Sequence, residues 1–186
     1  MNRKTPPSPP PLIPMPAALS DDLNALAQET HRIHESLAWS GQGQFEQLKL
    51  WRAMNILLGI PAAVLAAVSG GTGLAQPDAG TVPAVLALIA AGFGAALTTL
   101  NPSRRAAQAQ SAANAYLEIQ TAARQLLLVD LETLDRVEAR EKLAEVTIRR
   151  DEVNRTADPP GRYAYWRASR NFNKGGQSYE TDKGNS

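Results

Sequence analysis

Two histidines are the first residues in this chain whose spacing could support chemistry. His31 and His34 lie three residues apart, so on a helix they would share one face and could bind the same metal ion. No third ligand is indicated by spacing, and the chain contains no cysteine that could supply a thiolate, a disulfide or a nucleophile. We therefore expect no metal site and interpret the pair as solvated or in contact with a partner.

A glycine run offers a second chemical possibility, a phosphate-binding loop. Gly70-Gly71-Thr72-Gly73 matches such a loop only in glycine content, because no lysine follows it and no strand pattern precedes it. No Ser/His/Asp arrangement or pair of carboxylates can be localised either. We therefore predict that the chain is not an enzyme, with no catalytic residue and no cofactor.

The charge balance argues against nucleic acid as a partner. Nineteen basic and eighteen acidic residues give a formal net charge of +1, and aromatic residues make up 5% of the chain. Neither a strong positive field nor a set of stacking platforms is present.

The distribution of charged residues along the chain indicates which segments form membrane-spanning helices. Arg52 and Arg104 are separated by 51 residues that contain a single charge, Asp78. The two uncharged stretches, 53–77 and 79–103, each exceed the roughly 20 residues that a helix needs to cross a bilayer. This pattern predicts a transmembrane hairpin over residues 53–103, with spans at about 53–75 and 81–100.

The flanking charges predict the orientation of this hairpin. Lys49 and Arg52 precede the first span, Arg104 and Arg105 follow the second, and the connecting loop has no basic residue. Both termini should therefore lie in the cytoplasm of a cell with the hairpin in its membrane. The alternative, a buried hairpin in a soluble protein, would need a protein shell that the charged remainder of the chain does not supply.

Small residues recur every four positions within the spans. Such spacing lets helix backbones approach closely in lipid, either within one hairpin or between chains, and it favours a homo-oligomer. The candidate packing residues are Gly59, Ala62, Ala66, Gly70, Ala87, Ala91 and Ala95.

A few polar residues and prolines interrupt the apolar spans. Pro61 and Pro102 are candidate kinks. Polar side chains could line a wet pore, or the threonines could bond to their own helix and Ser69 could lie at a helix interface. The candidates are Asn55, Ser69, Thr98 and Thr99.

Outside the hairpin the pattern is helical throughout, so the predicted fold class is all-α. Residues 1–16 hold seven prolines and are expected to be a disordered leader, and residues 17–52 to be helices that lead into the membrane. The first of these helices should run from 21 to 39 and stop at the glycines of 40–43.

The cytoplasmic region after the hairpin is predicted to span 104–172, with 173–186 as a disordered tail. Its long helical pattern shifts register within 129–135, where we expect a bend, and an aromatic-rich segment at 163–172 could form a short helix. Four opposite-charge pairs at i,i+4 suggest a solvated face. They are Glu132/Arg136, Glu138/Lys142, Glu145/Arg149 and Asp151/Arg155.

Several short motifs occur in an order that resembles a known family. They are Thr30-His31-Arg32, Gly59-Ile60-Pro61-Ala62-Ala63, Asn101-Pro102-Ser103, Ala113-Asn114-Ala115-Tyr116 and Tyr163-Ala164-Tyr165-Trp166-Arg167-Ala168. Over about residues 30–172 the chain is similar to the SLATT family, the two-transmembrane effector domains associated with SMODS nucleotidyltransferases and SLOG sensors.

This resemblance implies an effector of the bacterial inner membrane that acts in anti-phage or other conflict systems. Such an effector would form pores after a nucleotide-type signal, which a separate partner protein would produce or sense. A hairpin alone encloses no pathway, so a non-conducting membrane anchor that scaffolds a cytoplasmic partner is the alternative.

Overall fold

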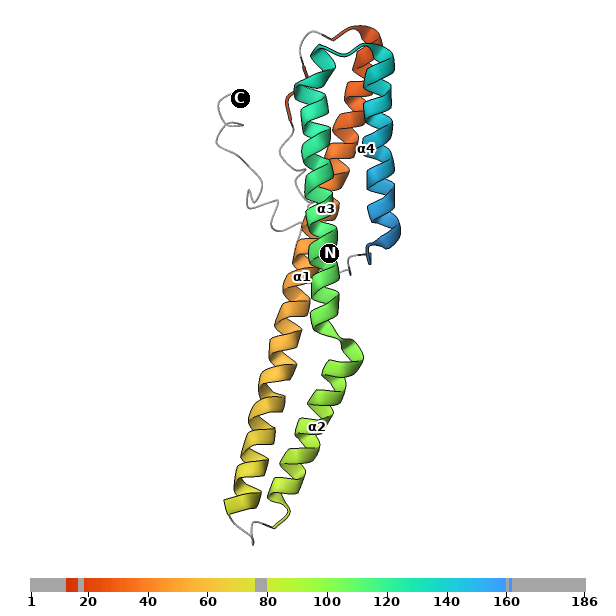
Figure 1. Ribbon diagram of the computed structural model, residues 1–186. Helices are drawn as coiled ribbons and strands as arrows, with labels where there is room; N and C mark the ends of the chain where they lie inside the picture. Colours follow the sequence, from red (N-terminus) through yellow and green to blue (C-terminus); the bar gives the residue numbers. More distant parts are fainter. Residues whose placement is uncertain (1–12, 17–18, 76–79, 160, 162–186) are drawn as a thin grey trace, which may run out of the picture. The chain divides into compact units, whose positions relative to one another are not determined.

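A computed structural model describes residues 13–16, 19–75, 80–159 and 161, and they form helices joined by short connections (Figure 1). Helix α1 spans Asp21–Ala75, α2 Val82–Leu100, α3 Pro102–Leu128 and α4 Arg136–Thr156, with a 3₁₀ turn, η1, at Asp130–Glu132. No strand occurs in these residues, so the all-α class is confirmed. The expectations for the leader up to residue 12, for 163–172 and for the tail lie outside the described residues.

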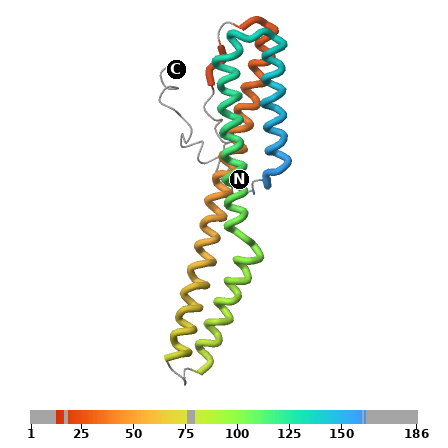
Figure 2. Tube along the Cα trace, viewed as in Figure 1, coloured from red at the N-terminus to blue at the C-terminus, as the bar shows by residue number. Residues whose placement is uncertain are grey.

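The chain divides into two compact units. One comprises Met1–Gln47 and Gln108–Ser186, and we call it the bundle unit; the other is Leu48–Ala107, the hairpin unit. In the bundle unit, segments of α1 and α3 lie side by side with α4 (Figure 2). All three helices therefore contribute to one interior.

The bundle unit has a conventional hydrophobic core. Branched and aromatic side chains fill its middle, and small alanines allow the helices to approach at the level of η1. The buried core residues are Ala27, Ile33, Leu37, Tyr116, Ile119, Ala123, Leu126, Leu127, Leu131, Ala139 and Val146. This unit can exclude water from its own apolar surface.

Two breaks between helices occur where the sequence predicts them. Asn101 adopts a left-handed conformation (φ 44°) that ends α2, and Pro102 starts α3. Between α3 and α4, Asp135 accepts hydrogen bonds from the backbone N–H groups of Val137 and Glu138 in a capping box. The bend within 129–135 is therefore confirmed.

The predicted helix stop at 40–43 is wrong, because α1 continues through these residues. A Cβ atom at Gly41 would lie 3.4 Å from the Cβ of Tyr116 on α3. A methyl group would make an ordinary contact at this distance, so Gly41 is not required sterically, and its burial against α3 offsets its low helix propensity.

The solvated face predicted from the i,i+4 pairs is largely confirmed, because six of the eight residues are exposed and only Arg149 and Asp151 are partly buried. Glu132 belongs to η1 and not to α4. Arg149 pairs with Glu118 of α3, and the Nε of Arg155 donates to the backbone carbonyl of Asp151. Charges on α4 thus contact another helix as well as their own.

In the hairpin unit, the last part of α1 pairs with α2. The α1 helix continues through Pro61 and ends at Ala75, and α2 ends at Leu100. Among the residues that the structure describes, two helices are long and apolar enough to cross a membrane, and the most apolar 18-residue window of each is only 6% buried. The core helices of a soluble protein would be mostly buried, so these windows have the exposure expected of lipid-facing helices.

Candidate functional site

The two helices of the hairpin unit meet along a seam with a regular spacing. Its less exposed positions alternate by three and four residues, as in left-handed helix pairs. They include Leu58, Ala62, Leu65, Ser69 and Thr72 on α1, and Pro83, Leu86, Ala90, Phe93 and Leu97 on α2. Gly59 lies beside this set, because a Cβ there would be 3.9 Å from Leu97 Cδ1. Within this unit, close approach is thus set by a heptad-like pattern.

Ser69 makes the polar contact of this seam. Its Oγ donates a hydrogen bond of 2.6 Å to the backbone carbonyl of Pro83, and the residue is 9% exposed. Between 53 and 75 and between 80 and 100, only Ser69 and Ala90 are buried. Ser69 therefore lies at a helix interface.

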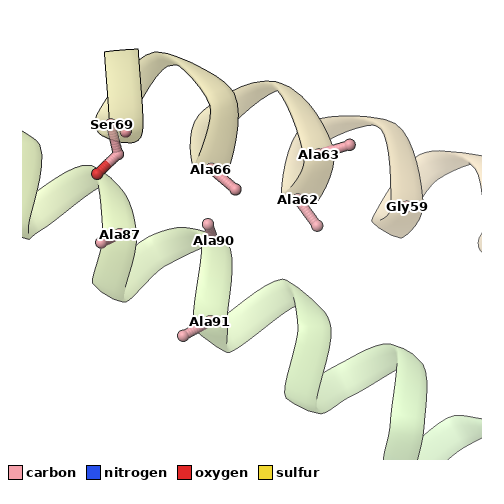
Figure 3. A pocket seen from close by; sticks show the side chains of 9 residues that line it. Gly59, Ala62, Ala63, Ala66, Ser69, Ala87, Ala90 and Ala91 are labelled. Carbon is pink, nitrogen blue, oxygen red and sulfur yellow. The ribbon is translucent and has the colours of Figure 1, made fainter. Parts of the chain in front are cut away.

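Beside the seam, small residues leave an open groove of about 640 Å³ (Figure 3). The side chains of Ala62, Ala66 and Ala90 point into the space between the two helices, and Ser69 closes one end. The groove is lined by Gly59, Ala62, Ala63, Ala66, Ser69, Gly70, Ala87, Ala90 and Ala91. Apart from Ser69, every lining residue is an alanine or a glycine, and none of the lining side chains is ionisable.

Six of the seven candidate packing residues line this groove, and Ala95 does not. Ala66, Gly70, Ala87 and Ala91 remain exposed in the single chain, so they are accessible to another helix. Sequence reasoning missed Ala90, the alanine that α2 buries most deeply. No sequence signal distinguishes Ala90 from Ala91, because α2 is apolar on every side.

The other candidate polar residues do not line the groove. Thr98 donates to the carbonyl of Gly94 in its own helix at 2.8 Å, and Asn55 and Thr99 are exposed. Thr72, which the sequence analysis did not single out, likewise donates to the carbonyl of Val68. In one chain these hydroxyls satisfy helix carbonyls rather than line a common path.

The histidine pair lies in the bundle unit, where the two rings have different surroundings. His34 is 8% exposed, and its Nε2 lies 3.2 Å from the side-chain Nε2 of Gln120 on α3. An amide nitrogen donates, so His34 Nε2 accepts and the neutral ring carries its proton on Nδ1. His31 is partly exposed, and no group of three metal-ligating side chains occurs in the described part of the chain.

Burial lowers the pKa of His34 from 6.5 to about 4, and the nearby His31 and Arg124 add electrostatic repulsion. Of the two expectations for the pair, solvated or in contact with a partner, the first is wrong for His34, which is buried against Gln120 of its own chain. Tyr116 lies in the same interior, donates to Asn154 Oδ1 at 2.7 Å, and has its pKa raised by burial. Both groups are neutral near pH 7 and hold α3 against its neighbours.

No protein-family model, curated protein or solved structure matches this chain.

Proposed function

We propose that this chain is a pore-forming effector of the bacterial inner membrane that acts as a homo-oligomer in an anti-phage or other conflict system. The hairpin unit inserts with both termini in the cytoplasm. The bundle unit receives a nucleotide-type signal, directly or through a partner protein, and oligomerisation assembles the pathway that one hairpin lacks.

The exposure of the hairpin is the observation that carries this proposal. Its most apolar windows are 6% buried, and large side chains such as Leu57, Leu74 and Leu88 are each more than two thirds exposed. Such a surface is stable in lipid or against other apolar helices and unstable in water.

The groove supports the oligomeric part of the proposal. Its exposed alanines and glycines provide a surface on which a helix of a second chain can pack closely. In lipid, such packing is driven by van der Waals contact, so small residues favour association. A ring of hairpins would be lined by apolar residues and hydroxyls, a composition suited to gating by dewetting.

The test is the inner-membrane potential of bacteria after induced expression. Carbonate extraction, run in parallel, reports whether the chain is inserted. We expect insertion and depolarisation, and we expect Ala66→Leu or Ala91→Leu to reduce depolarisation by filling the groove. Ala67→Leu is the matched control, because Ala67 is exposed at the same depth and does not line the groove.

A non-conducting anchor is the second candidate, and the chemistry of the hairpin favours it. The described residues between 53 and 100 carry no charge, and Ser69 is already bonded to Pro83. An anchor would insert without depolarising the membrane under any trigger and would co-purify with a soluble partner.

Depolarisation that is unchanged in both Ala66→Leu and Ala91→Leu would argue against oligomerisation through the groove.

A further inference from the structure

The hairpin unit carries its positive charge next to its apolar helices. Its basic residues are Lys49 and Arg52 on α1 and Arg104 and Arg105 on α3, and we call these four the basic collar. All four are exposed. Residues 48–75 and 80–107 contain no Asp or Glu.

A ring contact joins the two sides of the collar. The guanidinium carbon of Arg105 lies 5.0 Å from the ring centroid of Trp51 on α1, within the range of a cation–π interaction. Neither Arg104 nor Arg105 forms an ion pair with a carboxylate of the described residues. The Arg105 charge is thus positioned by an aromatic ring.

The collar lies where a bilayer changes from hydrocarbon to headgroups. The 19 residues of α2 span about 28 Å, which matches a hydrocarbon core of about 30 Å. Arg104 follows the end of α2 within about one helical turn, and Arg52 directly precedes the uncharged part of α1. Trp51 is of the residue type that concentrates at this boundary.

We infer that the basic collar binds the phosphates of anionic phospholipids, with Arg104 and Arg105 as the principal contacts. The inference rests on the proposed membrane insertion and names the lipid class that the inserted hairpin recognises. A guanidinium can bind phosphate oxygens in a bidentate manner, and a negatively charged leaflet attracts each basic residue near it. Zwitterionic lipids offer the same phosphate with a compensating cation attached.

The test compares how two lipids quench Trp51 in the full-length chain. Trp39→Phe and Trp166→Phe leave Trp51 as the only indole. The protein is reconstituted into phosphatidylcholine vesicles that contain equal mole fractions of either dibrominated phosphatidylglycerol or dibrominated phosphatidylcholine. We expect the anionic lipid to associate about two- to fivefold more strongly, and this preference to weaken in high salt.

The double variant Arg104→Gln/Arg105→Gln should bring the ratio of quenching by the brominated anionic lipid to quenching by the brominated zwitterionic lipid close to one. Taking the ratio within each variant cancels the change in Trp51 fluorescence that follows loss of the Arg105 contact. The control, Arg124→Gln/Arg140→Gln, removes two exposed arginines of the bundle unit and should keep the preference.

Equal quenching by the two lipids in the parent protein would overturn the inference. So would a control variant that loses the preference for the anionic lipid as fully as the Arg104/Arg105 variant does. Suppression of the preference by millimolar glycerol phosphate would assign the collar to small soluble anions and would overturn the lipid assignment. If neither lipid quenches Trp51 and carbonate extracts the chain, the proposed insertion itself fails, a result distinct from the loss of lipid preference.

Discussion

At the scale of single residues, His34 shows how burial sets a charge state. Its ring accepts a hydrogen bond from Gln120 on α3, and its charged neighbours are His31 on its own helix and Arg124 on α3. From α4, the bundle core receives the apolar side chains of Leu143 and Val146. Protonation would therefore place a charge in a poorly solvated site near other cations.

The stability of the bundle unit should fall in acid because of His34. Its pKa is about 4 in the folded chain and 6.5 when exposed, so between these values only the unfolded state is protonated. The free energy of unfolding should level off above about pH 7 and should decrease by about 2 kcal/mol between pH 7 and pH 5.

Denaturant unfolding of the reconstituted full chain, followed by circular dichroism, measures this dependence. The decrease in stability between pH 7 and pH 5 should disappear in His34→Gln and largely remain in His31→Gln. An identical pH profile in the parent and the His34 variant would contradict the assignment.

Ser69 gives a second prediction at this scale. Ser69→Ala removes the hydrogen bond to the Pro83 carbonyl and should lower the stability of the hairpin by about 0.5–1.5 kcal/mol, the range typical of interhelical bonds in lipid. Thr98→Ala is the control, because that hydroxyl bonds within its own helix. Unfolding in mixed micelles at increasing SDS fractions would reveal the difference, and equal effects of the two variants would exclude a special role for Ser69.

At the scale of elements, the 55 residues of α1 belong to two units with different environments. Residues 21–47 pack in the bundle unit and residues 48–75 in the hairpin unit. The glycines at 41 and 43 lie inside this helix without ending it, because side-chain packing contributes more than intrinsic propensity. Gly41 is the position where the structure shows this packing, the close approach of Tyr116.

Gly41 should tolerate alanine and reject leucine. The Cβ of alanine would make an ordinary contact 3.4 Å from Tyr116 Cβ, and the gain in helix propensity should leave stability unchanged or raise it by up to about 1 kcal/mol. Leucine would force α1 and α3 apart and should cost about 1–3 kcal/mol. Thermal unfolding of both variants measures the difference, and a leucine variant as stable as the parent would mean that the two helices do not pack here.

At the scale of the whole molecule, the two units bury their apolar residues against different surroundings. The bundle unit closes a core among three helices, whereas the hairpin unit exposes large side chains along both of its helices. The charge distribution follows the same division, with the basic collar adjoining the exposed apolar surface. A membrane around the hairpin unit would bury its exposed apolar side chains, whereas the bundle unit already buries its own.

The absence of cysteine makes the topology directly measurable. Single cysteines can replace Ser20, Thr81 and Thr156, which are all exposed. A membrane-impermeant maleimide should label Thr81→Cys in cells with a permeable outer membrane, and should label the other two variants only after the inner membrane is lysed. Labelling of Ser20→Cys or Thr156→Cys before lysis would contradict cytoplasmic termini.

The sequence by itself determined the features that depend on composition and local conformation. The uncharged stretches predicted the apolar helices that end at Ala75 and Leu100, and Asn101-Pro102 predicted the break between α2 and α3. These signals are local, because hydropathy and the left-handed preference of asparagine act within a few residues.

Only the tertiary structure decided which faces meet. A helix that is apolar on every side contains no signal for its contact face, so Ala90 could not be distinguished from Ala91. Likewise, spacing alone could not show that His34 is enclosed, that Arg149 pairs with Glu118, or that Gly41 packs against Tyr116. Each of these depends on residues far apart in sequence, which only packing brings together.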